Sequence, residues 1–399
     1  MKNEWQTKKL GNLCEIELGK TPARANKTFW DEKRETNNVW LSIADLLNAD
    51  DNIVVDSKEY LSDKGAAISK IVSKGTLLVS FKLTLGRLAF AGSDLFTNEA
   101  IAALTILNER ELSKEFLFYF LHFFDWRKAA ENDVKLKGMT LNKAKLKEMD
   151  VHFPPFREQK QIVNVLDEVF EKTTKAKENA EKNLQNAREL FESYLQSIFA
   201  NSGDDWEEIK LGDIGKVSMC KRIFKDQTAN TGDIPFYKIG TFGKEPNAYI
   251  SKEIYEDFRK KFSFPKKGDI LISAAGTIGR RVKYDGGHAY FQDSNIVWID
   301  NDEKQVLNDY LYHFYGACNW NSTKGATISR LYNDNLKQII IVFPKSLAKQ
   351  RAIIAKLDAL SAETKKLEAI YHQKLTDLDE LKKSFLHKSF NSELAGACS

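Results

Sequence analysis

Two stretches of the chain carry an apolar residue at every third or fourth position and contain no proline. They span residues 157–199 and 347–394, and each begins shortly after a proline, at Pro155 and at Pro344. Proline is favoured at the start of a helix and disfavoured inside it, so the pattern predicts two long helices. At ~1.5 Å per residue the first would span about 64 Å, which is too long for one neighbouring domain to cover.

The apolar positions form one seam on each predicted helix. The seam is expected at Ile162, Leu166, Ala176, Ala180, Leu184, Leu190, Ile353, Leu357, Leu367, Tyr371, Leu375 and Leu381. Steps of three and four residues, with one extra four-residue step that acts as a stutter, are typical of coiled coils. We expect an antiparallel pair in which residue i faces roughly residue 547 − i, so that Ala176 meets Tyr371 and Ala180 meets Leu367. The alternative is that each helix packs only on its own domain.

The chain also repeats itself in order. Trp5–Gly11 returns as Trp206–Gly212, and Lys74–Ser80 returns as Lys267–Ser273. The residues Thr84, Gly86 and Arg87 that follow return as Thr277, Gly279 and Arg280. Further along, Gly138-x-Thr140 returns as Gly325-x-Thr327, and Phe153-Pro154 returns as Phe343-Pro344. From Gln159 to Phe199 the offset to the second copy stays at 191, and 12 of 41 positions are identical. Ordered matches over nearly the whole chain indicate an internal duplication.

Before each predicted helix, short β-rich runs alternate with glycine turns and helical stretches. The runs are Thr76–Phe81, Ile101–Ile106, Asp269–Ser273 and Ile296–Ile299, and the helical stretches are Lys114–Phe124 and Gln305–Tyr315. This mixture predicts α/β domains at 1–156 and 200–346. The fold class we expect is α+β, with two duplicated α/β domains joined by two long antiparallel coiled-coil-like helices.

Composition excludes several classes of protein. No apolar run approaches the ~20 residues of a membrane span, and the N-terminal segment lacks a signal-peptide core, so we expect a cytoplasmic protein without a membrane partner. The four cysteines lie far apart, which argues against a zinc ribbon and against a disulfide framework. The six histidines are scattered, so no metal site is expected. The net charge of +4, from 60 basic and 56 acidic residues, does not by itself point to nucleic acid.

Motifs for catalysis are missing as well. The sequence has no G-x-x-x-x-G-K-[ST] loop for nucleotide hydrolysis and no G-x-S-x-G elbow of a hydrolase. Phe153-Pro-Pro-Phe156 resembles the N-P-P-F tetrad of adenine methyltransferases, but Phe153 cannot accept a hydrogen bond from the adenine amino group. No glycine-rich loop for a methyl donor precedes it. We therefore expect no catalytic residues and no bound cofactor.

Basic residues next to glycine turns and aromatic residues are the candidates for DNA binding. They are Lys20, Arg24, Lys82, Thr84, Arg87, Lys137, Lys221, Arg222, Lys225, Thr277, Arg280, Arg281 and Lys283. Lysine and arginine contact phosphates, and arginine can also bond the O6 and N7 atoms of guanine together. Any one of these clusters is more often solvated surface. Two related domains held apart by a rigid spacer nevertheless suit a bipartite target on one duplex.

The order of these motifs resembles the specificity subunit of Type I restriction–modification systems. The resemblance rests on W-x-x-x-x-L-G at the start of each copy, the segment Ile272–Gly279, Gly138-x-Thr140, and Phe153-Pro-Pro-Phe-Arg-Glu-Gln159 opening a long helix, and it covers residues 1–394. The first copy departs from the turn motif, reading Ser80-Phe-Lys-Leu-Thr-Leu-Gly86. The second copy reads Pro344-Lys-Ser-Leu-Ala-Lys-Gln350, so it lacks the glutamate.

The resemblance implies a non-catalytic subunit with target recognition domains at 1–156 and 200–346. The helices at 157–199 and 347–394 would act as spacer and dock two adenine-N6 methyltransferase subunits, and restriction subunits would join the complex. S-adenosylmethionine would then belong to the partner, which flips and methylates the adenine. Two alternatives stay open from the residues alone: a methyltransferase with its own activity, and a coiled-coil adaptor that binds only proteins.

Overall fold

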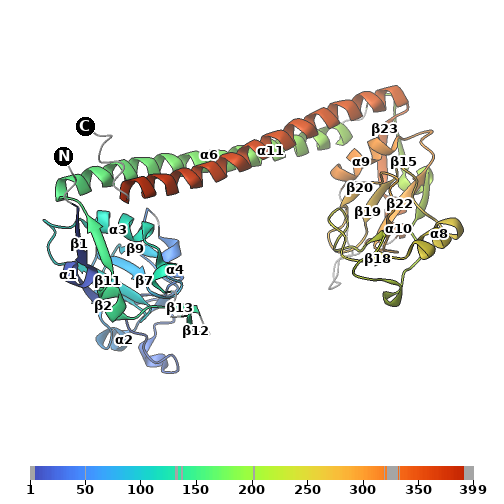
Figure 1. Ribbon diagram of the computed structural model, residues 1–399. Coiled ribbons are helices and arrows are strands. Elements are labelled where there is room, and N and C mark those ends of the chain that lie inside the picture. The colour runs from blue at the N-terminus through green and yellow to red at the C-terminus, as the bar shows by residue number, and fades with distance from the viewer. Residues whose placement is uncertain are drawn as a thin grey trace. The chain divides into compact units, whose positions relative to one another are not determined.

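The computed structural model describes residues 5–49, 51–130, 134–135, 138–200, 203–318, 320, 331 and 333–390, with only the backbone described at 134–135 and 138–140. The described residues divide into two compact units (Figure 1). The first lies within Met1–Glu178 and Leu375–Ser399, and the second lies within Asn179–Lys374. Each unit therefore combines one globular domain with parts of both long helices.

The globular domain of the first unit is built of short strands and few helices. In chain order these are β1 (Gln6–Lys9), α1 (Leu10–Leu13), β2 (Cys14–Leu18), the 3-10 turn Lys27–Phe29, β3 (Val39–Leu41), the 3-10 turn Asp45–Asn48, β4 (Ile53–Val54), β5 (Glu59–Tyr60), α2 (Asp63–Ala67), β6 (Ile71–Val72), β7 (Leu77–Ser80), β8 (Lys82–Leu83), β9 (Leu88–Ala91), β10 (Leu95–Thr97), β11 (Ile101–Ile106), α3 (Lys114–Phe123), α4 (Trp126–Ala129), β12 (Val134–Lys135), β13 (Gly138–Thr140), α5 (Lys143–Lys147) and β14 (Asp150–Phe153). The main sheet has the order β2-β11-β7-β9-β4, and a second sheet has the order β5-β3-β10-β6.

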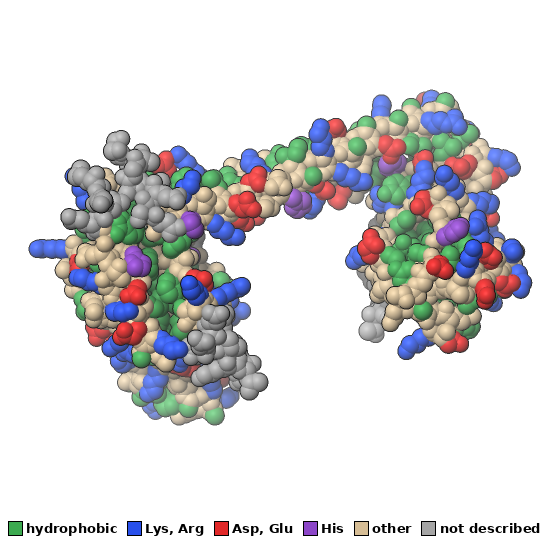
Figure 2. Space-filling model, in the orientation of Figure 1, with side chains coloured by type: hydrophobic (Ala, Val, Ile, Leu, Met, Phe, Trp, Pro, Cys, Tyr) green, Lys and Arg blue, Asp and Glu red, His purple; other side chains and the backbone are tan. Residues whose placement is uncertain are grey.

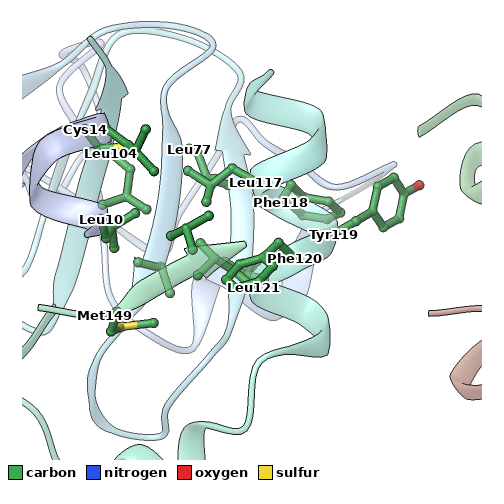
Figure 3. Close-up of a cluster of buried hydrophobic side chains, with 14 of the residues drawn as sticks. Leu10, Cys14, Leu77, Leu104, Leu117, Phe118, Tyr119, Phe120, Leu121 and Met149 are labelled. Atoms are coloured by element: carbon green, nitrogen blue, oxygen red, sulfur yellow. The ribbon is translucent and has the colours of Figure 1, made fainter. Parts of the chain in front are cut away.

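The core of this domain forms where α3 packs on the main sheet. All four residues of β7 are buried, because the sheet is covered on both faces. Ser113 begins α3 by accepting a hydrogen bond from the backbone N–H of Phe116, as an N-cap does. Phe118, Tyr119 and Phe120 of α3 all belong to the buried cluster, and Figure 3 shows the ring of Tyr119 at its edge. One apolar cluster, with Leu77 and Val79, therefore lies under α3, and a second, with Leu78, lies on the other face of the main sheet.

The globular domain of the second unit repeats the main elements. In chain order these are β15 (Trp206–Lys210), α7 (Leu211–Ile214), β16 (Gly215–Ser218), the 3-10 turn Lys225–Gln227, β17 (Ile234–Tyr237), β18 (Tyr249–Ile250), α8 (Lys252–Lys261), β19 (Ile270–Ser273), β20 (Arg281–Lys283), β21 (Tyr290–Phe291), β22 (Ile296–Asn301), α9 (Asn308–Ala317), α10 (Asn333–Gln338) and β23 (Ile340–Pro344). Its sheets have the orders β16-β22-β19-β20 and β18-β17-β21.

Strand pairing confirms the internal duplication. In the first unit Ile101 of β11 lies opposite Ser80 of β7, and in the second Ile296 of β22 lies opposite Ser273 of β19. The start of each copy pairs antiparallel with the strand that precedes its long helix, as β1 with β14 and β15 with β23. Each domain is thus closed by its first and last strands, and the long helix leaves directly from that closure.

The two predicted long helices are present. The first is α6 (Phe156–Ala200) and the second is α11 (Leu347–Phe390); residues 391–394 of the expected second helix lie outside the described residues. Tyr119 of α3 donates a hydrogen bond to Asp167 of α6 at 2.6 Å, which ties the helix to its own domain.

A buried glutamine fixes the start of each long helix. The side-chain oxygen of Gln159 accepts a hydrogen bond from Ser113 N at 2.9 Å, and its amide nitrogen donates to the carbonyl oxygens of Glu111 at 2.8 Å and Pro154 at 2.9 Å. This side chain is completely buried. It therefore satisfies three backbone groups that water cannot reach.

The second copy contains the same arrangement. Gln350 is also completely buried, accepts from Leu307 N at 2.9 Å and donates to the carbonyl oxygens of Gln305 at 2.7 Å and Pro344 at 2.9 Å. Gln159 and Gln350 are 191 positions apart and belong to the identical positions of the repeat. The glutamate that precedes Gln159, and that the second copy lacks, is not needed for this clamp.

The helices run antiparallel, but the expected register is wrong. In the first unit Lys177 pairs with Asp379, and Lys382 donates to Thr174 at 3.1 Å. Residue numbers in both pairs sum to 556 rather than to 547, a shift of nine positions. Several registers of α6 against α11 would place small side chains opposite large ones. The packing of Phe390 in the core of the first domain selects one of these registers.

The second unit shows the same register, because Arg188 pairs with Glu368 at 2.6 Å and these numbers also sum to 556. Ala176 therefore does not face Tyr371, and Ala180 does not face Leu367. The shift follows from packing at the helix ends, where Phe199 lies 5.3 Å from Tyr310 and 5.5 Å from Phe314, centroid to centroid.

Three expected seam positions are corrected. Leu190, Leu367 and Leu381 are 66%, 41% and 42% exposed, so they face solvent in the described structure. Beyond Leu184 the buried side of α6 continues through Leu195, because an ideal helix of 3.6 residues per turn drifts away from a strict three-and-four pattern. The other nine positions are buried or half-buried in the structure: Ile162, Leu166, Ala176, Ala180, Leu184, Ile353, Leu357, Tyr371 and Leu375.

Candidate nucleic-acid interface

A turn stabilised by a serine follows the buried strand β7 in the first domain. The hydroxyl of Ser80 donates to the carbonyl oxygen of Thr84 at 2.5 Å and accepts from the backbone N–H of Arg87 at 2.9 Å. The N–H of Gly86 donates to the carbonyl oxygen of Ser80 at 2.8 Å. These bonds close residues 80–87 into a compact loop, which we call the first serine turn.

The second domain builds the same loop after β19. The hydroxyl of Ser273 donates to the carbonyl oxygen of Thr277 at 2.6 Å and accepts from the N–H of Arg280 at 2.9 Å. The N–H of Gly279 donates to the carbonyl oxygen of Ser273 at 3.0 Å. We call residues 273–280 the second serine turn; the two turns match bond for bond although their sequences differ.

A glycine and a tryptophan complete each serine turn. Gly86 and Gly279 have φ values of +75° and +83°, a region that L-residues with side chains rarely adopt. A Cβ at Gly86 would collide with the indole of Trp126, and a Cβ at Gly279 would collide with the indole of Trp320. Only glycine fits under these rings, which explains the invariance of this position between the two copies.

The arginine that ends each turn is tied to a neighbouring loop. Arg87 donates through Nη1 to the carbonyl oxygen of Ile43 at 3.1 Å, and Arg280 donates through Nη1 to that of Phe242 at 3.0 Å. Both side chains are half-buried. Each arginine therefore has a structural role in its turn, and DNA binding by either stays a prediction.

Arg281 and Lys283 both contact α9. The guanidinium carbon of Arg281 lies 4.7 Å from the ring centroid of Tyr312, and burial lowers the pKa of this arginine. Its Nε is buried without a hydrogen-bond partner in the described part of the chain. Lys283 forms an ion pair with Asp309. Both basic residues thus have partners within the protein, and DNA binding by either stays a prediction.

Two candidate residues of the first domain, Arg24 and Lys82, lie near enough to Glu99 for their charges to act on its carboxyl. Burial raises the pKa of this carboxyl, but a hydrogen bond from Thr21 and the charges of Lys82 and Arg24 outweigh it, so the pKa of Glu99 lies below its ordinary value. Thr84 is exposed at the tip of the adjacent turn. Thr21 and Glu99 were not among the candidate residues, since neither belongs to a basic cluster.

Two tryptophans hold Arg24 in place. Its guanidinium carbon lies 4.2 Å from the ring centroid of Trp30 and 4.7 Å from that of Trp40, and it forms an ion pair with Glu59. The indole of Trp40 donates to the carbonyl oxygen of Lys20 at 3.0 Å, and the Lys20 side chain is exposed. Arg24 thus presents a positive charge on an aromatic support, an arrangement that suits stacking on bases.

In the second domain, Arg222 and Lys225 line a hollow of about 360 Å³ together with Phe224, Lys238 and Asn295. Phe224 is 60% exposed, so an apolar ring stands beside the basic groups. Lys238 and Asn295 were missed in the sequence, because they follow a short strand and precede another without any repeated motif. The hollow collects cations, an amide and an aromatic ring, which are the groups that contact phosphates and bases.

The remaining candidates have separate environments. Lys221 is exposed and its ammonium lies 4.9 Å from the ring centroid of Phe262, while Arg222 pairs with Asp293 at 2.8 Å. Thr277 is exposed at the tip of the second serine turn. Lys137 lies outside the described residues, as does the repeated motif at 325–327.

Charge of both signs covers the surface. On the face shown in Figure 2, Lys and Arg side chains are interspersed with Asp and Glu over both units. Any polyanion would therefore meet local groups of basic residues, such as Arg24 and Lys82 near Glu99 and the residues of the Arg222 hollow.

The described residues contain no group of three or more His, Cys, Asp and Glu side chains that could hold a metal ion. No helix within them has both the length and the apolar character that crossing a membrane requires.

Known proteins resemble this chain over most of its length. The family model described as the Type I restriction modification DNA specificity domain matches residues 2–186 and again 203–376. A Haemophilus influenzae protein named as a type I restriction enzyme specificity subunit is 46% identical over 264 residues, 65% of this chain and 67% of that protein. The type I restriction enzyme MjaIX specificity subunit of Methanocaldococcus jannaschii is 24% identical over 386 residues, 86% of this chain and 83% of its own.

Solved structures share the fold. A chain from work on complex assembly and conformational transition of the type I R-M system has a TM-score of 0.75 at 18% identity, with 99% of both chains covered. The HsdS subunit of Thermoanaerobacter tengcongensis has a TM-score of 0.57 at 17% identity, with 98% of this chain and 97% of that chain covered. At these identities the likeness concerns the fold, including the two domains and the long helices.

The family matches favour neither a self-contained methyltransferase nor an adaptor that binds only proteins. They fall on both copies of the duplicated domain, each with its serine turn and its flanking basic and aromatic side chains. The chain therefore belongs to the family of Type I restriction–modification DNA specificity domains, and it is a DNA-recognition subunit.

Proposed function

We propose that the two domains read the two halves of a bipartite site on one DNA duplex, and that the helix pair sets the gap between them. The observation that carries this proposal is the bond-for-bond match of the two serine turns. A duplicated rigid loop, with different residues at its tip and different basic neighbours, suits two related readers of two different sequences.

In this proposal some basic side chains contact phosphates and others contact bases. Exposed cations such as Lys20 and Lys221 contact phosphates and set the position of each domain, whereas side chains that reach base edges supply the specificity. Arg24, held between two aromatic rings and Glu59, and Arg222, at the edge of its hollow, are the candidates for base contacts. A bidentate arginine contact with guanine contributes about 1–3 kcal/mol of discrimination.

The helix pair would dock two methyltransferase subunits. Leu190, Ile370 and Leu381 expose 66%, 51% and 42% of their surface on α6 and α11, and exposed apolar residues on a helix are suited to binding another protein. In this proposal S-adenosylmethionine is bound by those subunits, restriction subunits join the complex, and the chain itself transfers no methyl group. The complex would act in the cytoplasm, where the DNA is.

The test compares the purified chain alone with the chain mixed with its methyltransferase partner. Methyl transfer from labelled S-adenosylmethionine to host DNA is measured, and the modified sites are mapped. The proposal expects no transfer by the chain alone and adenine methylation at one bipartite motif by the mixture. Methyl transfer by the isolated chain, or a modified motif without two separated halves, would contradict it.

A further inference from the structure

One residue of the first serine turn has a strained backbone. Leu83 has a φ of +64°, in the left-handed region where a Cβ crowds the following carbonyl. The residue at the same place in the second turn is Gly276, with a φ of +66°, which has no Cβ to crowd. The two turns thus share one backbone path, and only the first copy places a side chain at this point.

Burial does not explain this leucine. Its side chain is 51% exposed, so it adds little to the core. The other non-glycine residues with positive φ in the described structure are all polar, which is the usual choice there: Arg34, Asp51, Asn52, Ser294 and Glu303. An apolar, exposed side chain at a strained position is instead typical of a residue kept for binding.

The surrounding bonds hold Leu83 in this conformation. Its strand β8 pairs with β13, where Leu83 lies opposite Met139, and Leu141 donates through its N–H to the carbonyl oxygen of Phe81 at 2.9 Å. Together with the bonds of Ser80, these contacts fix the turn on both sides. The side chain of Leu83 is therefore presented to solvent by a rigid loop.

The neighbours of Leu83 point to nucleic acid as its target. Lys82 is half-buried, with its ammonium 5.2 Å from the ring centroid of Phe81, and Thr84 is exposed. These three side chains are complementary to a DNA strand. The cation and the hydroxyl can contact phosphates, and the apolar side chain between them can contact the face or the methyl group of a base. Leucine contacts DNA either at a thymine methyl in the major groove or as a wedge beside a base step.

We propose that Leu83 makes an apolar contact with a base and is a specificity-determining residue of the half-site read by the first domain. The inference rests on the proposed function, since it assumes that this domain reads one half of a bipartite site. Gly276 leaves the second domain without the contact, so the two halves are read by different chemistry at the same place of the turn.

The experiment uses the chain assembled with its methyltransferase partner and duplexes that carry the mapped target. Leu83→Gly and Leu83→Asn should keep or raise the thermal midpoint, because glycine and asparagine tolerate positive φ better than leucine does. Both should bind cognate DNA about tenfold more weakly, the effect of ~1.4 kcal/mol, and lose discrimination at one position of the first half only. Leu83→Met should restore part of the affinity.

Two controls separate this contact from other effects. Leu107→Asn removes a leucine that is 60% exposed and lies one position past the end of β11, about 20 Å along the strand from Ile101, and it should change nothing. Lys82→Ala should reduce the slope of log affinity against log salt by about one, whereas the Leu83 variants should leave the slope unchanged, since an apolar contact releases no counterion.

Replacing thymine by uracil at the affected position distinguishes the two sources of the contact. Equal losses from the base change and from Leu83→Gly identify the thymine methyl, and no loss from the base change identifies a wedge. Folded Leu83→Gly and Leu83→Asn complexes with wild-type affinity and discrimination would overturn the inference. If the wild-type complex itself failed to bind a bipartite site, the proposed function would fail instead.

Discussion

Replacing Gln159 by leucine tests the clamp that joins α6 to the first domain. The substitution keeps the size of the side chain and removes its three hydrogen bonds, leaving Ser113 N and the carbonyl oxygens of Glu111 and Pro154 without partners in a site that water does not reach. At ~1 kcal/mol or more for each buried unsatisfied group, the loss in unfolding free energy should be at least about 3 kcal/mol.

The assay is urea denaturation followed by tryptophan fluorescence, with hydrogen exchange to locate the loss. For a unit of roughly 200 residues a loss of 3 kcal/mol lowers the thermal midpoint by about 6–12 °C. Gln161→Leu is the matched control, because Gln161 lies two positions further on the same helix and is exposed. A loss below about 1 kcal/mol for Gln159→Leu, or a loss equal to that of the control, would refute the reasoning.

Gln159→Glu adds a test with a pH signature. A buried carboxylate cannot donate to the two carbonyl oxygens, so its pKa in the folded state should lie above the ordinary ~4.3. A raised acid pKa means that the charged form opposes folding. The deficit relative to wild type should therefore be largest at neutral pH and shrink as the pH falls toward 5.

Lys221→Ala should lower the slope of log affinity against log salt by about one, because an exposed phosphate contact is lost. Arg280→Ala should mainly lower the thermal midpoint, because Arg280 ties the second serine turn to a loop; equal slopes in both variants would contradict this division. Four residues inserted after Ala180 and four after Leu375 lengthen the helix pair by about 6 Å. The gap between the two halves of the methylated target should then grow by one to two base pairs of ~3.4 Å, as mapped on modified DNA. A folded variant that keeps the original gap would show that another element sets the gap. Burial lowers the pKa of His313 despite its contact with the Asp358 carboxylate. The neutral imidazole therefore stabilises the fold fully above about pH 6.5, and this contribution is lost as the pH falls. The thermal midpoint of the wild type should drop more between pH 7 and 5.5 than that of His313→Gln.

The elements of the fold follow closely from the sequence because their signals are local. Helix periodicity and the prolines predicted α6 and α11, and the ordered repeats predicted two related α/β domains. The register of the helix pair could not be obtained in this way, because it depends on where Phe199 and Phe390 dock in cores formed by distant residues. Comparing the residues of the two helices pair by pair does not include this tertiary packing.

The sequence identified the lysine and arginine side chains that are candidates for DNA binding, but it could not show which groups of the protein these side chains contact. Arg87 and Arg280 have the type and spacing of DNA-binding residues, yet each donates to a carbonyl of a neighbouring loop. The constant offset of 191 did mark Gln159 as a shared position, although only the structure shows its three partners. The strain at Leu83 is a property of φ, which a single sequence does not display.

The packing of Phe390 has a consequence for biosynthesis. Its ring lies 5.4 Å from that of Phe116 and 5.8 Å from that of Phe120, so the last turn of α11 completes the apolar core beneath α3. Phe390 follows Phe120 by 270 positions in the sequence, which is a delay of about 14–54 s on the ribosome at ~5–20 residues per second. During that interval the first domain exposes the aromatic surface of α3. A nascent chain that ends before α11 leaves the aromatic surface of α3 accessible to chaperones and proteases. Only a chain that contains both globular domains and α11 buries this surface.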